Sequence, residues 1–422
     1  MRGNTIRRLV ALASAMILLV PAAACESKSD DSGTPGATGE PIRVGSTLSL
    51  SGAFAATGAI HKIAGEAFIE RLNAAGGLLG RPVEWVLRDD ESDQARVATL
   101  YEQLITQDRV DLIMGPYATP NILSAMAVAE RHGYVLPQHT SVLAPLMTYE
   151  CQFPAWSIDF APNEFVPNQL LDAVASLPTP PQRIAIVTNQ NGSTDFVSYG
   201  SEGNRVGTVS IVESRGLEKV LEVQYPPNTT DWAPIAAQVR DANPDLVINN
   251  GLGLDPVNLL QAMSQLNYKP PLMFSLFPAP GPPLGLGEAA EGLLSVSIFE
   301  PNPALLERLG PTATEIVNDF QARAEAAQLS YTVFETQAAA SWNAWEILVA
   351  AVTGAGNLDH RAMCDWLHAN GADTTFSGHL TFDPAQNNFW PTTQILKQIQ
   401  DGDWVAVWPP DRAAAPLRGP AA

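Results

Sequence analysis

The amino-acid sequence predicts an α/β protein with two doubly wound lobes, each a parallel sheet with helices on both faces. The first observation is that strand-like and helix-like segments alternate from residue 42 onward, a pattern typical of such sheets. The second is that the same pattern restarts after residue 180. The third is the composition, because 422 residues with 46% hydrophobic and 16% charged side chains can bury more than one core.

The first lobe is expected to begin with a strand and a turn rich in glycine and alanine. The helix after that turn ends at the paired Gly76 and Gly77, a frequent C-terminal signal. The next helix places Val97, Tyr101 and Leu104 on one face, the spacing of an amphipathic helix. In order, we expect strand 42–50, turn 51–58, helix 60–77, strand 81–90, helix 94–108, strand 110–115, helix 120–133 and strand 134–137.

The second lobe repeats this plan with somewhat weaker helix signals. A single helix is expected over 197–214, although its glycines disfavour helix. A long helical stretch near 303–354 and short strands near 379–383 and 395–400 follow, and the sequence leaves open which lobe they join. The remaining elements are strand 183–189, strand 218–226, helix 230–244, strand 245–251, helix 255–267 and strand 271–277.

The N-terminal residues are typical of a targeting segment. Three arginines precede the apolar run LVALASAMILLV (9–20), which is too short to span a bilayer comfortably. PAAAC (21–25) follows and resembles the lipobox of bacterial lipoproteins, in which the cysteine is acylated, although Ala22 stands where Leu is usual. We expect a signal peptide over 1–24 and a lipid on Cys25, with an ordinary signal peptide as the alternative. Residues 25–41 then form the lipidated cysteine and a flexible tether rich in Ser, Gly, Pro and Asp.

The charge and the motifs exclude several classes of function. The formal net charge is −20, and no basic patch interleaved with aromatic residues is present, so we expect no nucleic-acid partner. No GxSxG, HExxH or P-loop motif occurs, and we expect no enzyme activity and no cofactor.

The stretch MGPYATPNI (114–122) predicts a sharp turn from a buried strand into a helix. Thr119 is a favoured N-cap, Pro120 suits the first helical position, and Gly133 closes the helix. The free N–H groups of such a helix start lie at the carboxyl edge of the sheet, where they favour an anion. A second loop, QHTS (138–141), leaves the adjacent strand with two hydroxyls, so the two loops together suggest a carboxylate site. The alternative is that Thr119 only caps its helix.

Several segments together resemble the solute-binding lipoproteins of ABC transporters for branched-chain amino acids and amides, which have the type I periplasmic-binding fold. The resemblance covers nearly the whole body of the chain, and the order of the segments is more specific than any one of them. They are IRVGSTLSLSGAFAATG (42–58), LNAAGGLLGRPVEWVLRDDESD (72–93), LITQDRVDLIMGPYATPN (104–121), AERHGYVLPQHTSVLAPL (129–146), RIAIVTNQNG (183–192), NTTDWAPIAAQVRDANPDLVINNG (228–251), EAAEGLL (288–294) and HLTFDP (379–384).

The resemblance implies two lobes joined by a hinge of three crossovers that close on a small molecule. Lobe 1 would take 42–156 plus 302–383, lobe 2 would take 157–301 plus 384–410, and 411–422 would form a C-terminal tail. It also implies the capture of a small carboxylate-bearing solute, an amino acid or an amide, for an ABC transporter permease. The protein would be a monomer, held by its lipid at the outer face of the cytoplasmic membrane, or free in the periplasm.

In this family the ligand carboxylate is bound by loops that match ATPN and HTS. The resemblance therefore assigns ligand binding to Thr119, Thr140 and Ser141, with Tyr117 and Ala118 lining the same turn. The glycine loop SGAFAATG (51–58) adds two further residues, Phe54 and Thr57. Thr57 stands where the family often has an aromatic wall.

One departure concerns the ammonium group of an amino-acid ligand. Family members commonly meet it with acids from the second lobe, but the loop MFSLFPAPG (273–281) holds none, and WSIDFAPNE (156–164) offers only Asp159 or Glu164. Either Asp159 receives the ammonium or the ligand has none, because an unpaired buried charge is costly. In the second case Phe277, with Trp156 and Tyr117, would enclose an apolar or aromatic organic acid, although Trp156 also suits ordinary packing.

Two further sets of residues bear on metals and disulfides. His360, Cys364 and His368 recur every four residues, but no fourth ligand is evident, so no metal is predicted. A disulfide between Cys151 and Cys364 is the more plausible use of these thiols outside the cell. Two other classes of function stay open: a ligand sensor that uses the same cleft and, with less support, an extracellular amidohydrolase.

Overall fold

The computed structural model describes residues 38–139, 141–392 and 394–420. The predicted signal peptide, Cys25 and most of the tether lie outside the described residues, as does Thr140. No helix in the described ranges is long and apolar enough to cross a membrane.

The first part of the chain, here called the first lobe, contains strands β1 to β5. Strand β1 pairs in parallel with β2 and β3, β4 pairs in parallel with β5, and the N–H of Gly115 bonds the carbonyl of Pro137 to join β3 to β4. The strand order is therefore β2-β1-β3-β4-β5. The elements are β1 (Ile42–Leu48), α1 (Ala55–Ala74), β2 (Val83–Asp89), α2 (Gln94–Thr106), β3 (Leu112–Ile113), α3 (Thr119–His132), β4 (Leu136–Gln138), η1 (Ala144–Leu146) and β5 (Gln152–Pro154).

The second lobe is built on one seven-stranded sheet of order β14-β13-β10-β9-β8-β6-β7. In this sheet β13 runs antiparallel to both of its neighbours, β10 and β14. Its parallel part, β7-β6-β8-β9-β10, has the same order as the first lobe. The elements are α4 (Pro162–Ala175), β6 (Arg183–Asn189), α5 (Gly192–Tyr199), α6 (Thr208–Ser214), β7 (Glu218–Tyr225), α7 (Ala233–Ala242), β8 (Leu246–Gly253), α8 (Asp255–Gln265), β9 (Leu272–Pro278), α9 (Gly281–Leu284), η2 (Gly287–Ala289), β10 (Leu293–Ser297), β13 (Ile395–Gln400) and β14 (Asp403–Trp408).

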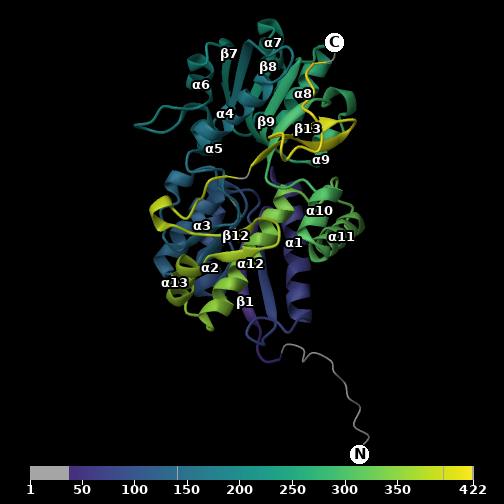
Figure 1. The fold of residues 1–422 in the computed structure, drawn as a ribbon. Coiled ribbons are helices and arrows are strands. Elements are labelled where there is room, and N and C mark those ends of the chain that lie inside the picture. The colour runs from purple at the N-terminus through teal and green to yellow at the C-terminus, as the bar shows by residue number, and fades with distance from the viewer. Residues whose placement is uncertain (1–37, 140, 393, 421–422) are drawn as a thin grey trace, which may run out of the picture. The chain divides into compact units, whose positions relative to one another are not determined.

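The helices after β10 return to the first lobe. Figure 1 shows α12 beside α1 and near β1, and the buried apolar residues of α11, α12 and α13 share one core with those of β1, β3 and β5. These elements are α10 (Pro303–Leu309), α11 (Pro311–Ala326), α12 (Thr336–Ala355), α13 (His360–Asn370), β11 (Ala372–Thr374), β12 (Gly378–Leu380) and η3 (Pro384–Gln386). The seven-stranded sheet has its own cores, one on each face.

Within the described ranges, the chain therefore passes between the lobes at three crossovers, which include residues 155–161, 298–302 and 381–392. The predicted α/β class with parallel sheets is confirmed. Of the late segments whose lobe the sequence left open, the helices and β12 join the first lobe and β13 joins the second. The lobe boundaries given above stay a prediction.

The single helix expected over 197–214 is wrong. Two short helices, α5 and α6, stand there instead, separated by a loop in which Ser201 and Asn204 form an isolated bridge. Gly200 and Gly203 take φ values of 72° and 90°, which a helix does not allow. Strand 110–115 is also shorter than predicted, because only Leu112–Ile113 pairs with β1.

A disulfide joins Cys151, next to β5, to Cys364 on α13 across a sequence separation of 213 residues. It links the sheet of the first lobe to the helices that return to it. No group of three or more His, Cys, Asp or Glu side chains in the described ranges is placed to hold a metal ion.

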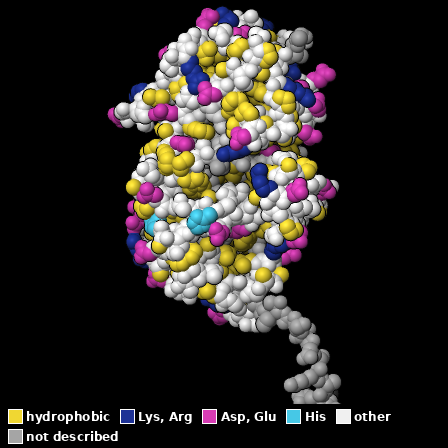
Figure 2. Space-filling model, in the orientation of Figure 1, with side chains coloured by type: hydrophobic (Ala, Val, Ile, Leu, Met, Phe, Trp, Pro, Cys, Tyr) yellow, Lys and Arg dark blue, Asp and Glu magenta, His cyan; other side chains and the backbone are white. Residues whose placement is uncertain are grey.

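On the face drawn in Figure 2, the Lys and Arg side chains of the described residues stand in ones and twos among Asp and Glu. This distribution accords with the net charge of −20.

Candidate functional site

A cavity of about 40 Å³ lies between the lobes. Most of its lining residues follow or end a parallel strand, so they lie at the carboxyl edges of the two sheets. Such edges are where open α/β sheets bind ligands. The lining residues are Phe54, Tyr117, Ala118, Thr119, Val142, Trp156, Ser193, Leu252, Phe277 and Gln337.

The turn before α3 brings a helix start to this cavity. Ala118 is the N-cap, with φ 73° and ψ 135°, and its carbonyl accepts the first helical bond from the Ile122 N–H at 2.9 Å. The expectation that Thr119 is the N-cap is therefore wrong by one residue, since Thr119 is already helical. A positive φ is strained for alanine, and strain of this kind gathers at binding sites.

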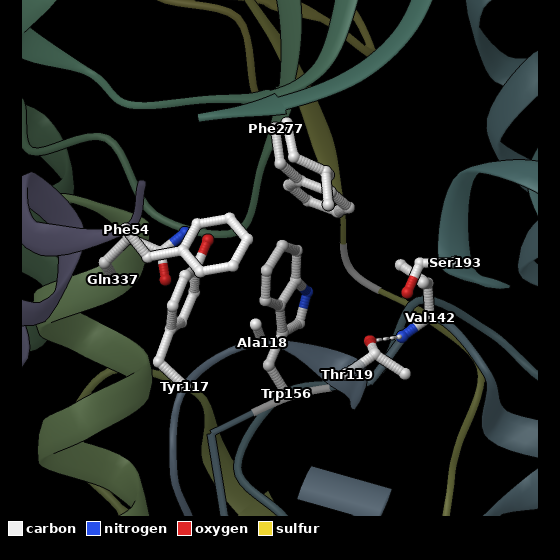
Figure 3. Close-up of a pocket in the computed structure, with 10 residues that line it drawn as sticks. Phe54, Tyr117, Ala118, Thr119, Val142, Trp156, Ser193, Phe277 and Gln337 are labelled. Carbon is white, nitrogen blue, oxygen red and sulfur yellow. Dashed lines mark hydrogen bonds between the residues drawn. The ribbon is translucent and has the colours of Figure 1, made fainter. Parts of the chain in front are cut away.

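A chain of hydrogen bonds ends on the hydroxyl of Thr119. The Leu143 N–H donates to Ser141 Oγ at 3.0 Å, and Ser141 Oγ donates to Thr119 Oγ1 at 3.4 Å. The Val142 N–H also donates to Thr119 Oγ1 at 3.1 Å, the bond drawn in Figure 3. Because Thr119 Oγ1 accepts both bonds, its own proton is left for an acceptor in the cavity. The helix start beside it favours a negatively charged acceptor.

The second lobe places Ser193 near this point, and Figure 3 shows it beside Val142 and Thr119. Ser193 lies in the first turn of α5, whose N-cap Asn191 accepts from the Ser193 and Thr194 N–H groups at 3.0 and 3.3 Å. Its hydroxyl is buried and has no hydrogen-bond partner among the residues that the structure describes. Both lobes therefore bring a hydroxyl to one side of the cavity.

Aromatic rings form the walls between the two lobes. Phe54 and Tyr117 meet edge to face with ring centroids 5.8 Å apart, and Trp156 and Phe277 do so at 5.7 Å. Trp156 lies in the first crossover and shares a core with the second lobe, to which Phe277 belongs. Burial raises the pKa of the Tyr117 phenol well above its usual range, and a hydrogen bond with Thr57 only partly opposes the shift. The walls are therefore uncharged.

Two adjacent histidines, His61 and His139, lie next to Tyr117. The His61 ring is 4.1 Å from that of His139 and 5.1 Å from that of Tyr117, and His61 Nε2 lies 3.1 Å from Gln337 Oε1. Burial lowers the pKa of His139 to about 4 and that of His61 well below its usual range, the latter with help from His139. Both rings are neutral near pH 7.

A buried ion cluster fixes the start of α12, which carries Gln337. Lys397 Nζ lies 2.6 Å from a Glu300 carboxylate oxygen and 3.6 Å from one of Glu335. The other Glu335 oxygen accepts the Gln337 N–H at 2.9 Å. Burial raises the pKa of the Glu335 carboxyl, and the Lys397 ammonium only partly opposes this. The cluster joins β13 of the second lobe to α12 of the first.

The structure brings five of the predicted ligand-binding residues into the cavity lining: Phe54, Tyr117, Ala118, Thr119 and Phe277. Thr57 and Ser141 are buried and do not line the cavity, although Ser141 bonds Thr119.

The predicted second-lobe acids lie elsewhere. Asp159 does not line the cavity, and its carboxylate accepts from the N–H of its neighbour Phe160 at 2.8 Å. Glu164 accepts from the Asn204 amide at 3.2 Å. No charged side chain is found among the described lining residues.

Four lining residues were not selected from the sequence: Val142, Ser193, Leu252 and Gln337. Ser193 could have been found, because NQNGS (189–193) follows a predicted strand and offers an Asn N-cap. No sequence pattern indicated that Gln337 would line the cavity, since it lies in a helix that follows no strand of the first sheet.

The chain belongs to the periplasmic binding protein family, because its sequence matches the family model over residues 41–403. The family predicted from the sequence is thereby confirmed. Among curated relatives, the Leu/Ile/Val-binding protein homolog 8 of Brucella abortus is 25% identical over 239 residues, which are 54% of this chain and 56% of that protein. The match thus spans about half the length of the relative.

Two solved structures are similar over most of the chain. The branched-chain amino acid transporter substrate binding protein LivJ of Streptococcus pneumoniae, in complex with isoleucine, has a TM-score of 0.69 and 17% identity, covering 90% of this chain and 100% of that one. An ABC transporter solute binding protein of R. palustris, in complex with benzoate, has a TM-score of 0.72 and 17% identity, covering 90% and 97%. At this identity they establish the fold.

Proposed function

We propose that this protein is the solute-binding component of an ABC importer, a binding protein and not an enzyme, which holds a small carboxylate between its two lobes. Family membership supports this, as do the solute-binding proteins among its structural neighbours. The observation that carries the proposal is the Thr119 hydroxyl, which accepts two hydrogen bonds and keeps its proton for the cavity beside a helix start. Thr140, next to Ser141, is proposed to complete this carboxylate end.

The solute we favour is an apolar or aromatic organic acid without an amine. An ammonium group in this cavity would meet no carboxylate among the described lining residues, and burying it unpaired would be costly. Four aromatic side chains line the same space and suit a flat apolar body. An amino acid is the second candidate, supported by the Leu/Ile/Val-binding relatives, and Asp159 would then have to move to reach it.

The proposal also covers the location of the protein in the cell envelope. A lipid on Cys25 would hold the monomer at the outer face of the cytoplasmic membrane, or the protein would be free in the periplasm, and the permease of the importer would be its protein partner. The disulfide between Cys151 and Cys364 supports an oxidising compartment.

Native mass spectrometry of freshly purified protein, followed by calorimetric titration, tests the proposal. Benzoate, benzamide and isoleucine are suitable probes, and we expect benzoate to bind about tenfold tighter than benzamide because only benzoate is charged. If the protein binds isoleucine and does not bind benzoate, the solute should be assigned as an amino acid and not as an organic acid without an amine. Hydrolysis of bound benzamide would overturn the assignment as a binding protein.

A further inference from the structure

Gln337 reaches the cavity from a different part of the fold than the other polar lining residues. It lies in the first turn of α12, whereas Thr119 and Ser193 follow strands of the two sheets. Figure 3 shows Gln337 next to Tyr117 and Phe54, on the side of the cavity away from Thr119 and Ser193. The cavity thus has a second polar end, separated from the carboxylate end by aromatic rings.

The side chain of Gln337 is held in one orientation. Its Oε1 lies 3.1 Å from His61 Nε2, and its backbone N–H is bonded by Glu335 at 2.9 Å. An amide oxygen can only accept, so His61 Nε2 must carry the proton of this bond. His61 is fully buried and neutral, and its ring is fixed between those of His139 and Tyr117. The hydrogen bond to this ring therefore occupies Oε1.

The amide nitrogen of Gln337 is what remains for a ligand. Nε2 carries two N–H donors and has no partner within residues 38–139, 141–392 and 394–420. The Gln337 residue as a whole is 7% exposed and lines the cavity. Donors of mostly buried side chains are normally satisfied. An acceptor on the bound solute would satisfy it.

We propose that Gln337 is a specificity-determining residue, which selects carboxylates that carry a second hydrogen-bond acceptor at the end away from the carboxyl group. This inference rests on the proposed function and narrows the solute to a hydroxylated or carbonyl-bearing organic acid. A site built to bond a polar group rejects the analogue that lacks it, because its own buried donor is then left unpaired. His61 is a positioning residue in this scheme.

Calorimetric titration with benzoate, 4-hydroxybenzoate and 4-aminobenzoate tests the inference. The hydroxyl oxygen is a good acceptor, whereas the aromatic amine is chiefly a donor. In the unaltered protein we expect 4-hydroxybenzoate to bind about tenfold tighter than either of the other two. Equal affinities for the three would overturn the inference and leave the proposed function standing. Failure of all three to bind would overturn this inference and the choice of an organic acid as the solute, and binding of isoleucine would then leave the role as a solute-binding protein standing.

Two variants sharpen the result. Gln337→Leu removes the donors at similar size, so the affinities for 4-hydroxybenzoate and benzoate should become nearly equal. Gln337→Glu replaces donors by acceptors and should shift the preference to 4-aminobenzoate. Thermal unfolding checks that each variant folds, and if the glutamate variant does not, the leucine variant and the unaltered protein still decide. A preference for 4-hydroxybenzoate that survives in Gln337→Leu would refute the role of this residue.

Discussion

Replacing Thr119 by valine removes an oxygen that serves two purposes. In the free protein Thr119 Oγ1 accepts from the Val142 N–H and from Ser141 Oγ, and valine leaves both of these buried donors without an acceptor. In the complex the same hydroxyl would donate to the carboxylate. The substitution keeps the shape of the side chain, so little packing is lost.

The two effects have separate magnitudes. A hydrogen bond to a charged group contributes about 1.5–3 kcal/mol, so benzoate should bind about 10- to 150-fold more weakly to Thr119→Val. The orphaned Val142 N–H should lower the free energy of unfolding by about 1–3 kcal/mol. Titration calorimetry measures the first quantity, and urea unfolding without ligand measures the second.

Thr119→Ser is the matched control, because it keeps the hydroxyl and loses only a methyl group. It should bind benzoate within about threefold of the unaltered protein, a difference of less than 1 kcal/mol. Benzamide is the second control, since a neutral ligand gains less from the donor. The reasoning is refuted if Thr119→Val binds benzoate normally, or if the serine variant is as weak as the valine variant.

Three further predictions concern stability measured by urea unfolding. Lys397→Met should lower the free energy of unfolding by about 3–5 kcal/mol, because it leaves two buried carboxylates without their cation. Lys62→Met, which removes an exposed ion pair, should change it by less than about 0.5 kcal/mol. Equal effects of the two substitutions would contradict this prediction. Replacing Cys151 and Cys364 together by serine should lower the free energy of unfolding by about 2–5 kcal/mol. An unchanged free energy of unfolding would show that the disulfide contributes nothing to stability in solution. The pKa of His139 is lowered from 6.5 to about 4 by burial, so the unfolded chain takes up a proton as the pH falls below 6.5 while the folded one does not. His139 alone should therefore lower stability by about 2–3 kcal/mol between pH 7.5 and 4.5, and His139→Gln should remove this contribution from the profile.

Much of the fold could be predicted because its signals are local. Alternating apolar segments gave the parallel sheets, and the turn at 114–122 was visible in Gly, Pro and Thr. The proximity of Thr119 and Ser141 also follows from local signals, because their loops leave neighbouring parallel strands at the same edge. The exact helix start was missed because an alanine with positive φ, at residue 118, is not expected from sequence.

The other end of the cavity depends on contacts that no local pattern reveals. Gln337 is held by His61, 276 residues earlier in the chain, and α12 reaches the cavity only because the chain crosses back to the first lobe. Asp159 was selected for its position near a crossover, but its carboxylate accepts a bond from the next backbone N–H. Side-chain direction in such a loop is set by backbone angles, here a φ of 70°, that composition does not fix.

The shared strand order of the two lobes explains why one fold serves chemically different ligands. Each lobe supplies the ends of strands in the order 2-1-3-4-5, and most of the residues that line the cavity lie at these ends. The proposed carboxylate end depends on a helix start and its hydroxyls, which any small organic acid could use. Which solute is bound then depends on a few residues around the rest of the ligand. In this chain Phe277 at the end of β9 brings no charge, and Gln337 on α12 brings donors without an acceptor. Under the proposed function, a solute with an amine would meet no acceptor at either residue, whereas an acid with a distant hydroxyl or carbonyl would bond Gln337 and pack against Phe277.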